Sequence, residues 1–247
     1  MSKLIDGFFF SSLIGKDLRY RAIVPNEARK SNAVLYLLHG LFGSAENWTE
    51  LTRLQEYAEH TDLIIAMPDG GDNWYTDSEE QYESFLIHDL LPEIEGRFGA
   101  PIDRNGRAIA GNSMGGYGAL KIALKYPDLF GFAASFSGAF HVTRFLPGMD
   151  GGELAPSILR VFGDKDSSVR NANDIFTIAA AAAKAGPVTP RIYFDCGLDD
   201  PFIDANREFA SALSAARIEY EFSELEGGHD WLYWDQRIAY LIQVLGQ

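Results

Sequence analysis

Residues 107–125 read RAIAGNSMGGYGALKIALK, and this stretch decides the fold. A short apolar run leads into a G-x-S-x-G motif centred on Ser113, and helical spacing follows until Pro127. Between a strand and a helix this motif forms a tight, strained turn, because glycines two residues before and after the serine let the two elements approach. The turn lifts the Ser113 hydroxyl away from the backbone, at a helix N-terminus that favours developing negative charge. The sequence therefore predicts a nucleophile at Ser113.

Short apolar runs on both sides of the motif predict further buried strands. The expected strands are 33–38, 63–67, 132–136, 191–195 and 219–223, and the expected helices are 47–59, 79–97, 203–216 and a last one from about 230. This alternation predicts an α/β fold, with a mostly parallel central sheet and helices on both faces. Residues 5–13 and 17–24 predict an antiparallel N-terminal hairpin.

The 247 residues read as a single domain, since no linker or internal repeat interrupts them. The regular alternation breaks only at about 138–187, where loops rich in Gly and Pro precede a helix through residues 179–183. We interpret this stretch as a cap-like insertion that sets the size of the pocket.

A serine hydroxyl is a weak nucleophile and needs a positioned base. When the serine lies on a strand–turn–helix elbow, the chain order is serine, acid, histidine, which leaves only His141 and His229 as candidates. His141 follows the strand at 132–136 and comes too early. His229 follows two glycines in the loop between the last strand and the last helix, so we predict His229 as the general base.

The acid that orients this base is expected in the loop after residues 191–195. Asp199 and Asp200 both lie there, and spacing alone does not separate them. Asp195 ends the strand and is expected to be a structural hydrogen-bonding residue.

A tetrahedral intermediate needs two backbone N–H donors, which together form an oxyanion hole. One is expected from Met114, directly after the nucleophile. The other is expected from the H-G-x-x-G loop at residues 39–43, with the Leu41 N–H as first choice and that of Phe42 as second.

The amino-acid composition limits the kinds of partner that the protein can bind. With 35 acidic and 21 basic residues the net charge is −14, so nucleic acid is repelled, and no segment approaches a transmembrane length. The single cysteine, Cys196, forms no internal disulfide, and no signal-like apolar stretch opens the sequence, so we expect a cytoplasmic protein. Zinc spacing, a complete calcium loop and a nucleotide-binding motif are all missing from the sequence, so we expect no metal and no cofactor.

Five blocks in order resemble the esterase D-like family of the α/β-hydrolases, over nearly the whole chain. They are LLHG at 37–40, WYTD at 74–77, SMGGYGAL at 113–120, GLDD at 197–200 and GHDW at 228–231. The chain looks most like tributyrin-type acetylesterases and feruloyl esterase domains. This resemblance implies an α/β-hydrolase fold and a serine carboxylesterase that hydrolyses short-chain acyl esters, acetyl or feruloyl esters among them, through an acyl-enzyme.

The resemblance also bears on the site. It favours Asp200 over Asp199 as the acid that orients His229, and it supports Leu41 and Met114 as oxyanion donors. Because relatives often associate, a homo-oligomer is compatible with the resemblance, although the sequence itself does not give the oligomeric state.

The same triad also serves alternative functions. S-formylglutathione hydrolases resemble this chain but usually carry His at the position of Tyr117, and mycolyltransferases interrupt the glycine pair that follows Ser-Met. A thioesterase of the first kind or an acyltransferase is therefore the alternative to an esterase, and a non-catalytic binding module on the same scaffold is a third hypothesis.

Aromatic residues on the loops at the catalytic edge are candidates for the walls of a substrate pocket. We single out Phe42, Trp74 and Trp231, with Trp231 and Phe42 ahead of Trp74.

Overall fold

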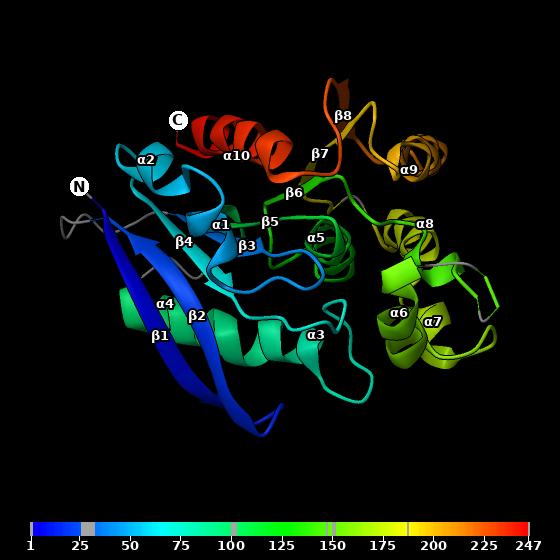
Figure 1. Cartoon of the computed structure of the whole chain (residues 1–247), viewed down its shortest axis with the longest axis horizontal. Coiled ribbons are helices and arrows are strands. Elements are labelled where there is room, and N and C mark those ends of the chain that lie inside the picture. Colours follow the sequence, from blue (N-terminus) through cyan, green and yellow to red (C-terminus); the bar gives the residue numbers. More distant parts are fainter. Residues whose placement is uncertain are drawn as a thin grey trace.

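The structure, a computed structural model, describes residues 2–25, 33–99, 103–146, 148–149, 152–186 and 188–246. In this part of the chain one sheet has the strand order β1-β2-β4-β3-β5-β6-β7-β8 (Figure 1). The strands are β1 (Lys3–Ser11), β2 (Lys16–Val24), β3 (Ala33–Leu38), β4 (Leu63–Pro68), β5 (Arg107–Asn112), β6 (Phe132–Phe136), β7 (Arg191–Gly197) and β8 (Tyr220–Leu225). The pairs β1–β2 and β2–β4 are antiparallel and all the other pairs are parallel. The predicted mostly parallel sheet with an N-terminal antiparallel hairpin is confirmed.

The central strands read as continuous apolar runs because both faces of the sheet are covered. In β3, Val34 and Tyr36 belong to the core on one face, and Leu35 and Leu37 belong to the core on the other. Successive side chains of a strand point to opposite faces, so one short run supplies two cores.

Ten α-helices surround the sheet within the described residues. They are α1 (Asn47–Glu50), α2 (Leu54–Ala58), α3 (Tyr82–Phe85), α4 (Leu91–Phe98), α5 (Met114–Lys125), α6 (Ala155–Phe162), α7 (Ser168–Ala172), α8 (Ile175–Ala185), α9 (Ile203–Ala216) and α10 (Trp231–Leu245). Helices α1, α2 and α10 contribute to one core, and α3 to α6, α8 and α9 contribute to the other (Figure 1).

Two expected helices differ from the structure. The one expected over 47–59 breaks into α1 and α2, because the Thr52 hydroxyl donates to the Trp48 carbonyl and accepts from the Leu54 N–H, which replaces helical bonding locally. The one expected over 79–97 begins later, at Tyr82, and contains a π-helical turn at Leu86–Leu90 between α3 and α4.

The stretch at 138–187 contains α6, α7 and α8, beside α5 and α9 (Figure 1). Its residues 147, 150–151 and 187 lie outside the described part of the chain. Among the helices that the structure describes, none has the length and apolar character to cross a bilayer.

Because β3, β4, β5, β6, β7 and β8 run parallel, their carboxyl ends lie at one edge of the sheet. The loops that follow these ends carry the candidate site residues.

Candidate active site

Ser113 lies on the turn between β5 and α5, with φ +53° and ψ −115°. This backbone conformation is rare for any residue with a side chain and stores strain. The Ser113 N–H donates to the carbonyl of Phe136 at the end of β6 (2.9 Å), which anchors the turn to the neighbouring strand. The serine is therefore held as the first residue ahead of a twelve-residue helix, at its N-terminus.

Gly111 and Gly115, which lie two residues before and two residues after Ser113, pack against each other. A Cβ on Gly111 would stand 2.6 Å from the carbonyl carbon of Gly115, and a Cβ on Gly115 would stand 2.5 Å from the carbonyl oxygen of Leu38. In each case the collision is with backbone, which cannot move aside. The G-x-S-x-G spacing is thus explained by the close approach of β5, α5 and the end of β3.

Ser113, His229 and Asp200 form one hydrogen-bonded chain. The Oγ of Ser113 lies 3.0 Å from the Nε2 of His229, and the Nδ1 of His229 lies 2.8 Å from the Oδ2 of Asp200. These are the distances and the order that a nucleophile, a base and an orienting acid require. The structure therefore brings together the predicted nucleophile, the predicted base and the aspartate that the resemblance favours.

The structure separates the two neighbouring acid candidates. Asp200 is buried, and its second oxygen accepts the Phe202 N–H at 2.8 Å. Burial opposes ionisation, but the hydrogen bonds from His229 and Phe202 hold the pKa of Asp200 below its ordinary value. The side chain of Asp199 is exposed, and its N–H donates to the Gly227 carbonyl. Only Asp200 reaches the imidazole.

Asp195 is buried at a distance from this chain of hydrogen bonds. Its carboxylate accepts the hydroxyls of Tyr193 (2.7 Å) and Tyr233 (2.8 Å). Burial raises the pKa of Asp195 to about 7. It holds β7 to α10, which agrees with the structural role expected for it.

The loops that carry the acid and the base are fastened to each other. The N–H of Leu198 donates to the carbonyl of Leu225 (2.8 Å). The His229 ring is then held edge-on between the rings of Phe202 and Trp234, at centroid distances of 5.0 and 4.9 Å. Both loops and the start of α10 thus fix the position of the imidazole.

The two leading candidates for the oxyanion hole keep a free N–H. Within the described residues, no protein acceptor takes the N–H of Leu41 or of Met114. The N–H of Phe42, the second choice in this loop, donates to the Asp72 carboxylate at 2.9 Å. The geometry therefore favours Leu41 over Phe42.

His39 sets the direction of the Leu41 N–H. Its Nε2 accepts the Gly70 N–H at 2.9 Å, so its Nδ1 carries the proton and donates to the Gly40 carbonyl at 2.7 Å. Burial lowers the pKa of His39, which keeps this ring neutral. In a trans peptide the carbonyl and the following N–H point in opposite directions. By holding the Gly40 carbonyl, His39 turns the Leu41 N–H the other way.

A small apolar cavity of about 140 Å³ adjoins the triad. It is lined by Trp74, Ala139, His141, Val142, Phe145, Leu154, Ile158 and Phe202. Phe202 contacts His229, and the Ala139 N–H donates to the Ser113 carbonyl at 3.2 Å. A larger hollow of about 780 Å³ lies instead at the start of β7 and β8, at the opposite edge of the sheet.

Of the three aromatic residues expected at the pocket, the structure places only Trp74 at this cavity. Trp74 lines the cavity, with its indole N–H on the Ser157 hydroxyl of α6 (3.1 Å). Phe42 and Trp231 do not line it: the Phe42 side chain is 62% exposed, and the Trp231 ring packs against Trp48 and Trp234.

Sequence reasoning missed the aliphatic walls of the cavity, which come from the stretch after β6. Leu154 and Ile158 are spaced four residues apart and lie on one face of a helical turn, which was the available signal. His141 lines the cavity as well, but its Nε2 pairs with Glu208 (2.8 Å) and not with Ser113.

Comparisons with known proteins identify the family and the fold. The family model described as "Putative esterase" matches residues 11–242. An acetyl esterase from Caldicellulosiruptor saccharolyticus is 30% identical over 94% of this chain and 93% of its own. Among solved structures, an S-formylglutathione hydrolase from Staphylococcus aureus superposes with a TM-score of 0.89 at 25% identity over 100% of both chains. A ferulic acid esterase gives 0.83 at 25% identity, over 100% of this chain and 98% of that one. The fold is the expected α/β-hydrolase fold.

Proposed function

The chain belongs to this esterase family and is a serine carboxylesterase, and from that premise we propose that it hydrolyses short-chain acyl esters through an acyl-enzyme on Ser113. The observation that carries the proposal is the continuous hydrogen-bonded chain from Ser113 through His229 to the buried carboxylate of Asp200.

In the first half of the reaction, the Ser113 oxygen attacks the ester carbonyl while the Nε2 of His229 takes the hydroxyl proton. Asp200 accepts from Nδ1, which keeps the imidazole in the correct tautomer and stabilises its protonated form. The negative charge on the tetrahedral intermediate lies between the N–H groups of Leu41 and Met114, at the N-terminus of α5. His229 then gives its proton to the departing alcohol.

In the second half, water replaces the alcohol. His229 takes a proton from this water as it attacks the acyl-enzyme, and the same two N–H groups stabilise the second intermediate. Collapse of that intermediate releases the carboxylic acid and returns the proton to Ser113.

The cavity beside Ser113 supports a short acyl chain. A volume of about 140 Å³ equals the space of roughly four to five water molecules in the liquid. Its walls are apolar, so a chain of a few carbon atoms fits without leaving an unpaired polar group. The similarity to an acetyl esterase agrees with this size, and the similarity to a ferulic acid esterase adds feruloyl esters as candidates.

Thioester hydrolysis by the same triad is the second candidate, because an S-formylglutathione hydrolase shares the whole fold. This chain has Tyr117 where the resemblance predicts His for such enzymes. The Tyr117 ring is buried and its hydroxyl donates to the Asn173 carbonyl at 2.7 Å, which suits a packing role and favours the ester.

We propose that the chain forms one domain and that the stretch at 138–187 is its cap. Ala139, His141, Val142, Phe145, Leu154 and Ile158 of this stretch line the cavity. The cap then limits the length of the acyl chain.

We further propose a cytoplasmic enzyme that acts on free small esters as a homo-oligomer, without nucleic-acid or membrane partners. The strongly acidic composition disfavours a nucleic-acid partner, and the buried free thiol of Cys196 agrees with a reducing compartment. The homo-oligomer rests on the resemblance to relatives that associate. Cell fractionation and sedimentation of the purified protein test it.

A substrate panel tests the proposed specificity. We expect the kcat/KM values for p-nitrophenyl acetate and butyrate to exceed those for p-nitrophenyl octanoate, methyl ferulate and S-formylglutathione. A fluorophosphonate probe followed by peptide mapping should label Ser113. A panel in which S-formylglutathione leads would establish the thioesterase instead.

A further inference from the structure

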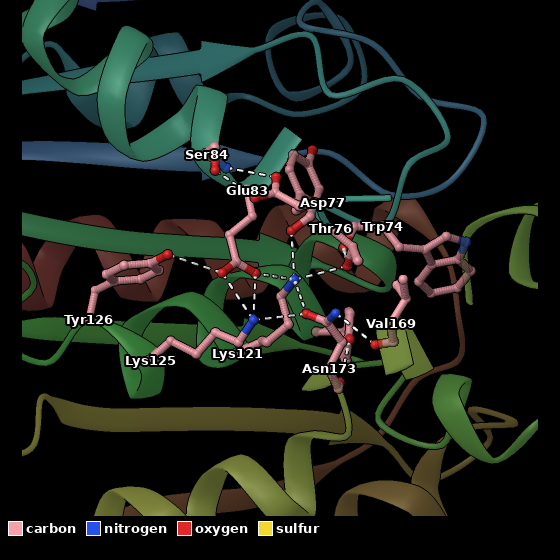
Figure 2. A network of polar contacts seen from close by, with 12 residues as sticks. Trp74, Thr76, Asp77, Glu83, Ser84, Lys121, Lys125, Tyr126, Val169 and Asn173 are labelled. Carbon is pink, nitrogen blue, oxygen red and sulfur yellow. Dashed lines mark hydrogen bonds and ion pairs between the residues drawn. The ribbon is translucent and has the colours of Figure 1, made fainter. Parts of the chain in front are cut away.

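Helix α5 carries a fully buried cation about two turns beyond Ser113. The ammonium of Lys121 donates to the Tyr75 carbonyl (2.7 Å), the Thr76 hydroxyl (2.9 Å) and the Asn173 side-chain carbonyl (3.2 Å). It also pairs with Glu83 at 2.8 Å. Figure 2 shows this ammonium at the centre of a network that joins α5 to the turn at residues 74–77.

Two lysines of the network share one buried carboxylate. Glu83 pairs with both Lys121 and Lys125, so one buried carboxylate serves two ammonium groups (Figure 2). Burial opposes ionisation of Glu83, but the two lysines hold its pKa below the ordinary value. A buried ion pair contributes little net stability compared with well-packed apolar side chains. Stability alone therefore does not explain a buried lysine at this position.

The turn that Lys121 binds has an unusual backbone. Trp74 and Tyr75, neither of them glycine, have φ values of +53° and +48°. Bulky side chains rarely adopt this left-handed region, and two successive cases need strong outside support. Lys121 supplies such support at the Tyr75 carbonyl, and the Thr76 hydroxyl that it also binds donates to the Trp74 carbonyl (2.9 Å).

Tyr75 links this turn to the oxyanion loop. Its hydroxyl donates to the His39 carbonyl at 3.1 Å. Its ring is wedged between two glycines: a Cβ on Gly70 would lie 2.4 Å from it, and a Cβ on Gly118 would lie 2.7 Å from it. A shift of Tyr75 would therefore move His39 and, through the Gly40 carbonyl, the direction of the Leu41 N–H.

We propose that Lys121 is a positioning residue of the oxyanion hole: its ammonium holds the Trp74–Thr76 turn so that Tyr75 supports the loop carrying the Leu41 N–H. This inference rests on the proposed function of Ser113 and its oxyanion donors. Trp74 belongs to the same turn and lines the acyl cavity, so the cation also fixes one wall of the pocket.

The protonation of Lys121 supports the inference. Burial lowers its pKa to about 8, against the attraction of Glu83 and with the repulsion of Lys125. The other groups that face the ammonium are Asp77, which attracts it, and the Tyr117 ring, whose centroid lies 5.6 Å away. Loss of the proton removes one N–H donor and the positive charge, so the hold on the turn weakens above about pH 8.

The test compares Lys121→Met with Lys125→Met. Lys125 also binds Glu83 and Asn173, but it donates nothing to the turn, so it controls for loss of the ion pair. We measure kcat and KM for p-nitrophenyl acetate per active site, with active sites counted by fluorophosphonate titration. We expect kcat of Lys121→Met to fall about 10-fold with KM within about 2-fold, a fraction of the cost of removing a donor outright. Lys125→Met should stay within about 2-fold of wild type.

The pH profile gives a readout that a purely structural role would not move. The wild type should lose kcat above about pH 8, and Lys121→Met should lack this decline. Lys125→Met should shift the decline to higher pH, because the repulsion that lowers the pKa of Lys121 is gone. The same alkaline decline in all three proteins would overturn the proposal.

Tyr75→Phe tests the contact between the turn and the oxyanion loop, also in the case that Lys121→Met does not fold. It removes only the hydroxyl that supports His39, so we expect the same loss in kcat, and the double variant should be no worse than the poorer single one. A kcat of Tyr75→Phe equal to that of wild type overturns the proposal. Failure of the proposed function looks different, because wild type itself would then neither hydrolyse the ester nor react with the probe.

Discussion

Gly197 and Gly227 lie so close together that a Cβ on Gly197 would stand 2.2 Å from the Gly227 carbonyl oxygen. Gly197 ends β7 ahead of the acid loop, and Gly227 lies two residues before the base. This contact sets the distance between the two loops and thereby the hydrogen bond between Asp200 and His229.

Gly197→Ala should therefore damage both folding and catalysis. The added methyl group meets backbone, so the loops must separate, and we expect kcat to fall at least about 100-fold, since small misplacements of a catalytic group are costly. Gly96→Ala is the matched control. Gly96 is exposed on α4, and a Cβ there would have no atom within 4 Å. This variant should keep full activity and gain up to about 1 kcal/mol of stability. Equal activity of the two variants would refute the account of this contact.

The two neighbouring aspartates give a second prediction. Asp200→Asn should lower kcat by about 10⁴-fold, because an amide in place of the orienting carboxylate favours the wrong imidazole tautomer. Asp199→Asn should change kcat less than about 3-fold, since the exposed Asp199 side chain does not reach His229 and its N–H bond to Gly227 is kept. Steady-state kinetics on an activated ester checks both, and a larger loss at Asp199 would reverse the assignment.

The stability of the protein should depend on pH through Asp195. Its folded-state pKa of about 7 lies above the ordinary value of 3.8, so between these values the folded state binds more protons than the unfolded state. The free energy of unfolding therefore falls as pH rises from about 4 to 7, by up to about 4 kcal/mol from this group. Denaturant unfolding of wild type and Asp195→Asn at pH 5 and pH 8 isolates the effect. The free energy of unfolding of the variant, relative to that of wild type, should be higher at pH 8 than at pH 5. The same difference at both pH values would contradict the predicted pH dependence.

The length of the acyl chain should depend on Ile158. Ile158→Ala lengthens the apolar cavity, so we expect the ratio of kcat/KM for p-nitrophenyl hexanoate over acetate to rise about 10-fold. Val161→Ala removes buried carbon from the same helix without touching the cavity, and its ratio should remain that of wild type. If both variants change the ratio equally, general loosening of α6 explains the effect better than the shape of the pocket.

The sequence predicts most of what local pattern and chain order control. The G-x-S-x-G turn marks Ser113, and the order of the parallel strands leaves His229 as the one histidine in a suitable loop. The continuous apolar runs predict the central strands closely, because both faces of the sheet are covered.

The sequence does not predict the contacts between segments that are distant along the chain. Asp199 and Asp200 are neighbours with the same chemistry, and only the folded loop shows which one faces the imidazole. The N–H of Phe42 donates to Asp72, which lies 30 positions further along the chain. Lys121 looks like an ordinary helical lysine, since nothing local reveals that Glu83 and Tyr75 surround its ammonium.

Turnover of p-nitrophenyl acetate by Ser113→Ala is the most direct test of the central claim. Removal of the hydroxyl prevents the acyl-enzyme, so kcat should fall by about 10⁴-fold or more, while the fold and the free Leu41 and Met114 N–H groups remain. A circular dichroism spectrum and melting temperature equal to those of wild type would show that the protein is intact. Activity near the wild-type level in this intact variant would contradict the assignment of Ser113 as the nucleophile.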